Sequence, residues 1–75
     1  MTESDIVRMA NQIAAFFRAY PQEEAVAGVA KHIRDFWEPR MREALARHLA
    51  AGGEGLDPVA RAGAERALAD EARAA

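Results

Sequence analysis

The sequence contains no cysteine, no marked excess of either charge and no long apolar run. The lack of cysteine excludes disulfides, thiolate metal sites and a cysteine nucleophile. Twelve acidic and ten basic side chains give a formal net charge of -2, whereas nucleic-acid-binding domains normally carry a clear basic excess. The longest apolar stretch, Ile13 to Phe17, is too short to span a membrane, and the acidic N-terminal residues do not resemble a secretory signal. We therefore expect a cytoplasmic protein that binds neither nucleic acid nor membrane.

Motifs that carry chemistry are also missing from the sequence. His32 and His48 lie in different segments and form no zinc-binding pattern. The glycine-rich stretch at residues 52–55 follows a predicted helix and has no Gly-Lys-Ser/Thr after it, so it indicates a helix stop and not a phosphate-binding loop. The carboxylates are spread along the chain, and no hydroxyl lies in a nucleophile motif. We predict no catalytic, cofactor-binding or metal-binding residue in this chain.

What the sequence does contain is the apolar spacing of helices. Large apolar residues recur every three or four positions over residues 3–19, 21–38 and 39–51, which predicts three helices. Pro21 ends the first helix and suits the first turn of the second. Pro39 either kinks a continuing helix or begins a third one. Gly28, inside the second helix, indicates close approach of another helix. The predicted fold class is all-α, a small bundle of three helices plus a weaker C-terminal helix.

The last third of the chain differs in composition. From residue 50 onward the only large apolar residues are Leu56, Val59 and Leu68, in an alanine-rich background. We predict a helical core domain at residues 1–51, followed at residues 52–75 by a glycine loop and an alanine-rich helix or tail. Asp57-Pro58 predicts a helix start. With so thin an apolar stripe, this last helix is expected to be frayed or docked on a partner.

Residues 31–42 are the most informative segment, because they concentrate the single tryptophan, a phenylalanine, a proline break and four cationic side chains. Adjacent Phe36 and Trp37 point about 100° apart on a helix, so one ring is expected in the core and the other toward a partner. Tryptophan and arginine are enriched at interface hot spots. An ordinary core tryptophan with solvated arginines is the alternative. The predicted partner interface comprises Asn11, Gln12, Phe16, Phe17, Phe36, Trp37, Pro39, Arg40, Met41 and Arg42.

Two blocks of the sequence resemble a known family. Residues 9–17, MANQIAAFF, and residues 25–42, AVAGVAKHIRDFWEPRMR, resemble the delta subunit of NAD-dependent, molybdenum-containing formate dehydrogenases. The blocks occur in the family's order and spacing, and the likeness covers about residues 6–60. The FWxPRM pattern is its most distinctive part, whereas the alanine-rich end is unspecific.

The resemblance implies a small subunit of a cytoplasmic complex that oxidises formate to carbon dioxide and reduces NAD. In such complexes the alpha subunit holds bis-molybdopterin guanine dinucleotide and iron–sulfur clusters. The beta and gamma subunits hold FMN, further iron–sulfur clusters and the NAD site. The implied role of this chain is that of a non-catalytic accessory subunit, which assembles or stabilises the complex by docking on the alpha subunit.

Two other functions remain open from the sequence. A transient maturation factor would hold the molybdenum-containing subunit open for cofactor insertion and then leave. A small helical DNA-binding regulator would use the local basic excess at residues 31–47, where five Lys or Arg face three Asp or Glu. The negative net charge disfavours the DNA-binding function.

Overall fold

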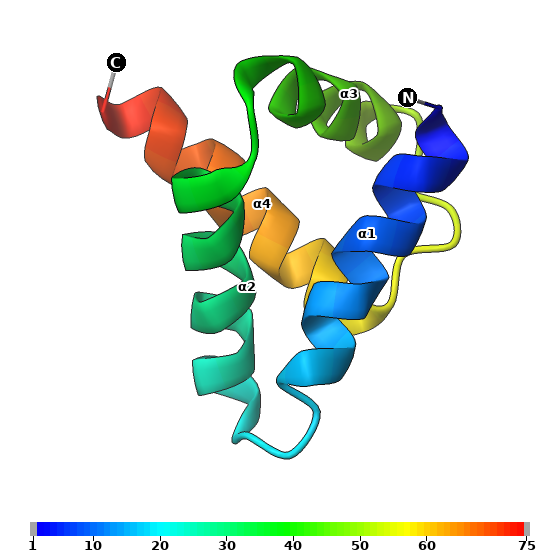
Figure 1. The fold of residues 1–75 in the computed structure, drawn as a ribbon. Coiled ribbons are helices and arrows are strands. Elements are labelled where there is room, and N and C mark those ends of the chain that lie inside the picture. Colours follow the sequence, from blue (N-terminus) through cyan, green and yellow to red (C-terminus); the bar gives the residue numbers. More distant parts are fainter. Residues whose placement is uncertain (1, 75) are drawn as a thin grey trace.

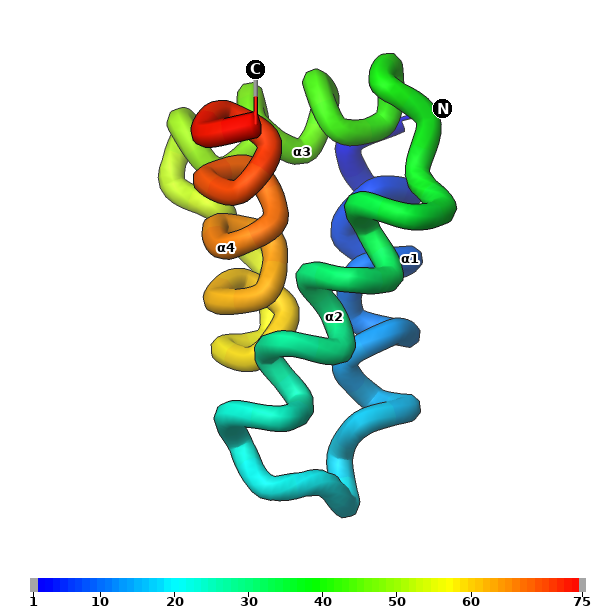
Figure 2. Tube along the Cα trace, turned by 90° about the vertical axis from the view of Figure 1, so that its left-hand side faces the viewer, coloured from blue at the N-terminus to red at the C-terminus, as the bar shows by residue number. Residues whose placement is uncertain are grey.

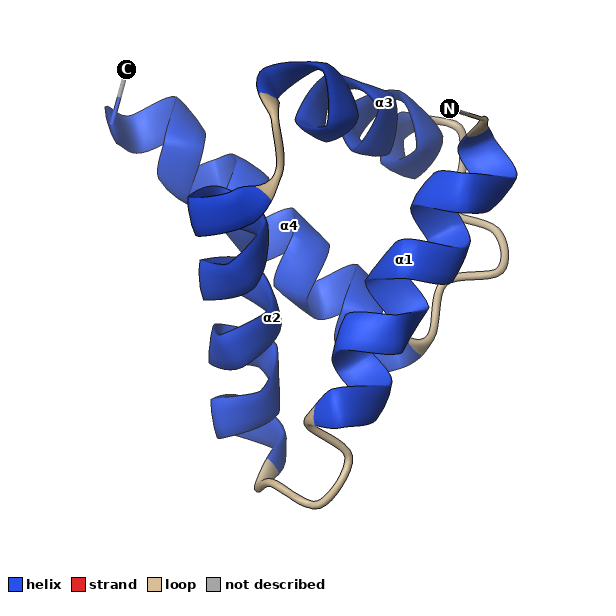
Figure 3. Cartoon of the chain, viewed as in Figure 1, coloured by secondary structure: helices blue, strands red, loops and turns tan. Residues whose placement is uncertain are grey.

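The computed structural model describes residues 2–74, which form four α-helices and, within that range, no strand (Figures 1 and 3). The predicted all-α class is therefore confirmed. The helices are α1 (Glu3–Phe16), α2 (Gln22–Phe36), α3 (Pro39–Ala50) and α4 (Pro58–Ala74).

The helices form two layers closed at one end. In Figure 1, α1 and α2 run in opposite directions in the front layer, joined by a loop at the bottom, and α4 lies behind them. Figure 2 shows the same layers from the side, with α3 crossing the top of the molecule. The most extensive helix pairing is that of α2 with α4.

Local sequence explains where the helices begin and end. Thr2 caps α1 with a reciprocal capping box, in which its side chain accepts from the Asp5 amide and Asp5 accepts from the Thr2 amide. Pro39 lies in the first turn of α3, so the chain starts a new helix there and does not kink an old one. Asp57 accepts from the Val59 amide at 3.0 Å, which confirms the predicted start of α4. Two helices end earlier than predicted, α1 at Phe16 and α2 at Phe36.

The C-terminal helix is part of the core, contrary to the expectation that it would be frayed or docked on a partner. Ala60, Ala64 and Ala67 are fully buried in the same cluster as Ile33 and Leu45. This core takes residues from both sides of the boundary predicted at residues 51–52. A count of large side chains underestimated the contribution of α4 to the core. Small residues contribute there because they allow helices to approach closely.

Glycine allows that approach at two places. A Cβ on Gly63 of α4 would lie 2.4 Å from Cγ1 of Val29 on α2, closer than real Cβ atoms come to any neighbour. A Cβ on Gly28 would instead lie 2.5 Å from the ring of Phe17. The helix approach predicted at Gly28 therefore occurs at Gly63, whereas Gly28 accommodates an aromatic ring.

Candidate partner-binding groove

The front layer carries a groove of about 400 Å³ between α1 and α2. It is lined by Met9, Gln12, Ile13, Phe16, Phe17, His32 and Trp37. None of these seven residues is an acid, a lysine or an arginine. Four other surface pockets of the described chain each include at least one carboxylate or cationic side chain. We refer to this feature as the α1–α2 groove.

The walls of the groove follow from helical spacing. Met9, Ile13 and Phe16 are separated by four and three residues, so they share one face of α1. Phe17 is the C-cap of α1, where the chain leaves the helix, and its ring covers Gly28. On α2, His32 and Phe36 are four residues apart, and their ring centroids lie 4.9 Å apart.

Two phenylalanine rings remain exposed at the groove, Phe16 in its lining and Phe36 beside it. Phe16 is 73% exposed and Phe36 is 72% exposed. Phe16 packs edge-on against the Phe17 ring, with centroids 5.0 Å apart. Exposed aromatic side chains that flank a concave apolar surface are typical of interaction sites.

Adjacent Phe36 and Trp37 separate as the 100° rotation predicted. Phe36 points to solvent, whereas Trp37 is 5% exposed and belongs to the core cluster. Trp37 is the C-cap of α2 with extended backbone, φ -84° and ψ 132°, and its side chain also lines the groove. Trp37 was predicted at the interface, but its burial makes it a core residue that reaches a partner only through the groove.

Asn11 and Arg42, both predicted at the interface, bond within the chain. The Asn11 amide donates to the Gly55 carbonyl oxygen at 3.0 Å and accepts from the Asp57 amide at 2.9 Å, so it holds the glycine loop against α1. The Arg42 guanidinium donates to the Trp37 carbonyl oxygen and pairs with Glu71 of α4. Both polar groups are thus engaged by the fold itself.

The remaining predicted interface residues lie in two separate places. Gln12, Phe16 and Phe17 line the groove and Phe36 stands beside it. Pro39 and Arg40 are exposed at the start of α3, where they line a different pocket with Glu38 and Glu43. Met41 is partly buried against the core. The structure therefore does not gather the ten residues into one surface.

Sequence reasoning omitted three of the groove residues from the site, namely Met9, Ile13 and His32. Met9 and Ile13 carry the same three-and-four spacing as Phe16, so the α1 pattern contained that signal. The position of His32, four residues before an exposed phenylalanine, was the corresponding signal on α2.

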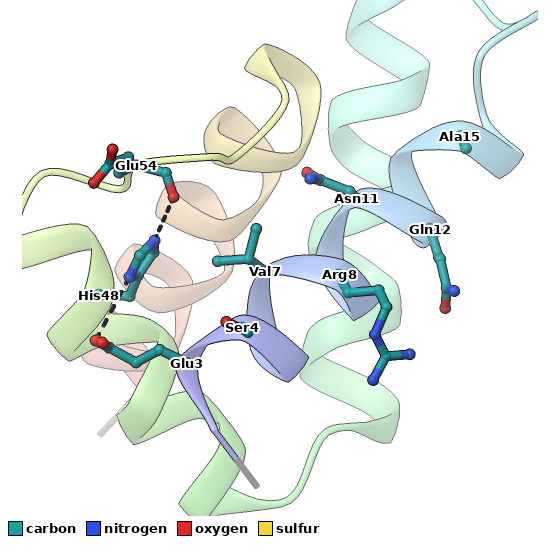
Figure 4. Close-up of a pocket in the computed structure, with 9 residues that line it drawn as sticks. All are labelled: Glu3, Ser4, Val7, Arg8, Asn11, Gln12, Ala15, His48 and Glu54. Atoms are coloured by element: carbon teal, nitrogen blue, oxygen red, sulfur yellow. Dashed lines mark hydrogen bonds and ion pairs between the residues drawn. The ribbon is translucent and has the colours of Figure 1, made fainter.

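A larger and more polar pocket, of about 690 Å³, lies where α1, α3 and the glycine loop meet (Figure 4). His48 stands between two oxygen atoms there. Its Nε2 atom is 2.7 Å from the Glu54 carbonyl oxygen, and its Nδ1 atom is 3.6 Å from a carboxylate oxygen of Glu3 (Figure 4). Ser4 lines the same pocket, but the contacts of the His48 ring are with Glu54 and Glu3, and residues 2–74 hold no group of three or more potential metal ligands.

Two ion pairs, Arg8–Asp5 and Lys31–Asp35, lie on the helices that form the groove. The Thr2 backbone amide, followed by the Arg8 side chain, lowers the pKa of Asp5 from its ordinary value of 3.8 to about 2. On α2, the hydrogen bond from Lys31 lowers the pKa of Asp35. The Arg8–Asp5 and Lys31–Asp35 distances are 2.8 Å and 2.6 Å. These pairs neutralise the helix surfaces that adjoin the groove.

The comparisons with known proteins assign a family. None of the helices formed by residues 2–74 combines the length and hydropathy needed to cross a membrane. No curated protein and no solved structure matches the chain significantly. The family described as NADH-dependent formate dehydrogenase delta subunit FdsD matches residues 5–64, a range that contains every residue of the α1–α2 groove. The chain therefore belongs to the FdsD family, the delta subunits of NADH-dependent formate dehydrogenase.

Proposed function

We propose that this chain is a non-catalytic accessory subunit that stabilises or assembles a cytoplasmic, NAD-dependent formate dehydrogenase complex by docking on its molybdenum-containing alpha subunit. The observation that carries the proposal is the match to the delta-subunit family over most of the chain. An uncharged groove flanked by two exposed phenylalanine rings supports a binding role.

The cofactors of the complex belong, in this proposal, to other subunits. The alpha subunit would hold bis-molybdopterin guanine dinucleotide and iron–sulfur clusters, and the beta and gamma subunits would hold FMN, further clusters and the NAD site. The donor chemistry of this chain supports that division. The sequence offers no thiolate for an iron–sulfur cluster. The ring nitrogens of His48 contact the Glu54 carbonyl oxygen and the Glu3 carboxylate. They therefore do not point, together with other metal ligands, toward a common site.

Docking would stabilise the complex through burial of exposed apolar surface. Fully burying a phenylalanine side chain contributes about 1.5–3 kcal/mol, and Phe16 and Phe36 retain nearly three quarters of their exposure in the free chain. Since α1 and α2 are already folded, few residues need to be ordered on binding, so little of that gain is lost.

The test is to produce the complex with and without this chain. We expect the complex that lacks it to lose subunits during gel filtration and to lose formate-dependent NAD reduction faster at elevated temperature. The chain should also be present at one copy per alpha subunit in the mature enzyme. Unchanged assembly and unchanged inactivation rate in its absence would refute the proposal. Absence of the chain from the mature enzyme would instead identify it as a transient maturation factor.

A further inference from the structure

We infer that the α1–α2 groove binds an apolar helical segment of the alpha subunit that is uncharged where it meets the groove. This inference rests on the proposed function and adds the surface and the chemistry of its occupant. It is carried by the lining of the groove, by the charges beside it and by the two exposed rings.

The lining selects an uncharged occupant. Five of the seven lining side chains are Met9, Ile13, Phe16, Phe17 and Trp37, and the other two, Gln12 and His32, have polar groups but no permanent charge. A carboxylate or ammonium group buried here would lose its hydration without gaining an oppositely charged partner, which is costly. Apolar side chains would gain from burial in the same place.

The two ion pairs on α1 and α2 do not alter that selection. Arg8, one helical turn before Gln12, pairs with Asp5, and Lys31, next to His32, pairs with Asp35. Each pair presents no net charge to an approaching partner. The groove therefore complements an uncharged segment. Its lining offers no charge that would attract a strongly acidic or basic segment.

The shape of the groove favours a helix. The α1 side of the groove extends over about two helical turns, from Met9 to Phe16, and an amphipathic helix docks in an apolar groove through side chains spaced by three or four residues. Phe16 lines the groove at the C-terminal end of α1, and Phe36 lies beside the groove at the C-terminal end of the antiparallel α2 (Figure 1). We expect these two rings to contact the apolar face of the bound helix at different points along its length. The Gln12 amide is exposed and free to orient toward polar groups at its edge.

Another subunit is a better occupant than a second copy of this chain. Members of the family are delta subunits of a dehydrogenase, so other subunits of the complex are possible partners for the groove. A symmetric dimer would require each exposed ring to enter the groove of the other copy. The oligomeric state of the free chain tests that alternative directly.

The first experiment measures binding of purified chain to the delta-free complex. The double variant Phe16→Ala, Phe36→Ala should weaken the affinity about 30-fold or more, as expected when hot-spot side chains are truncated. The matched control is the double variant Glu65→Ala, Arg66→Ala, which truncates two exposed side chains of α4 that do not line the groove. The control should bind within about threefold of wild type. Circular dichroism establishes that each variant is folded.

The second experiment locates the contact without weakening it. A photoreactive p-benzoylphenylalanine replaces Phe16 in one chain and the exposed Glu65 of α4 in another. We expect cross-links to the alpha subunit from position 16 and none from position 65. The cross-linked alpha peptide should be helical and uncharged at the contact.

The outcomes separate this inference from the proposed function. Wild-type binding combined with full binding by the double variant and no cross-link at position 16 overturns the groove assignment and leaves the accessory role standing. Failure of the wild-type chain to bind the complex overturns both. A dimer of the free chain that the double variant dissociates, with alpha binding retained, assigns the groove to a second copy and also overturns the inference.

Discussion

A Cβ atom on Gly63 would lie 2.4 Å from Cγ1 and 2.5 Å from Cβ of Val29, and 3.2 Å from the Val26 carbonyl oxygen. Gly63 and Val29 are both buried, so neither has solvent into which to move. Glycine is therefore what allows α2 and α4 to approach closely. This contact explains how a helix with few large side chains contributes to the core.

Gly63→Ala should destabilise the chain even though alanine is the better helix former. The substitution gains about 1 kcal/mol of helix propensity, but overpacking of a buried site costs typically about 1–3 kcal/mol. The branched Val29 side chain cannot rotate away, so we expect a cost in the upper part of that range and a net loss of about 1–2 kcal/mol. Urea unfolding followed by circular dichroism measures it. An unchanged or higher midpoint would contradict the close packing.

Gly28→Ala is the matched substitution, and it should act on binding more than on stability. Its Cβ would meet the Cε1 and Cζ atoms of Phe17, which form the far end of a partly buried side chain. That ring can swing outward, so we expect the free energy of unfolding to change by less than about 1 kcal/mol. The displaced ring changes the wall of the α1–α2 groove, so affinity for the delta-free complex should fall. Equal affinities of variant and wild type would show that the Phe17 position is irrelevant to binding.

Sequence patterns predicted the helices well because their ends depend on local chemistry. The Asp57 cap acts within a few residues and was predicted. For Pro39 the sequence left a kink and a helix start open, and the structure has the helix start. The importance of α4 was missed because it depends on a contact between Gly63 and Val29, which are far apart in the chain. Small residues carry no apolar signal of their own, so only their partner reveals that they are buried.

Trp37→Ala and Phe36→Ala should differ strongly in their effect on the free energy of unfolding although the two residues are adjacent. Truncation of the buried Trp37 leaves a cavity and costs about 3–5 kcal/mol, a large part of the stability of so small a domain. Truncation of the exposed Phe36 should change the free energy of unfolding by no more than about 0.5 kcal/mol. Thermal unfolding of the two variants measures the contrast. Comparable losses in both would show that Phe36 is also part of the core.

The predicted partner residues illustrate what spacing does not determine. The exposure of Phe16 at the groove depends on where α2 lies. Helical periodicity does not give the position of α2. Asn11 was predicted at the interface as an amide beside an apolar face, and Arg42 as an arginine of the segment at residues 31–42. Their hydrogen-bond partners, Gly55 and Glu71, are supplied by remote parts of the chain. Such pairings follow from the tertiary fold and have no local signature.

Asn11→Ala should release the glycine loop. The Asn11 side chain bonds to backbone groups of Gly55 and Asp57, and an average hydrogen bond contributes about 0.5–1.5 kcal/mol. We therefore expect a loss of about 1–3 kcal/mol and faster hydrogen exchange at the Asp57 amide. Gln12→Ala, at the neighbouring exposed position, is the control and should leave that exchange rate unchanged. Slow exchange retained at Asp57 in the Asn11 variant would show that the clamp is dispensable.

Acid should destabilise the chain in part through Asp5. Hydrogen bonds from the Thr2 backbone amide and from Arg8 lower the pKa of Asp5 to about 2 from an ordinary value of 3.8. A lowered folded-state pKa means that the carboxylate stabilises the fold fully above about pH 4, and that this contribution is lost as the pH falls through 2. Asp35, whose pKa Lys31 also lowers, acts in the same direction. The melting temperature of wild type should therefore fall more steeply between pH 4 and pH 2 than that of Asp5→Asn, whose amide oxygen still accepts from Thr2 but does not titrate. Parallel melting curves for the two proteins over this range would show that the Thr2–Asp5–Arg8 bonds contribute nothing to folding.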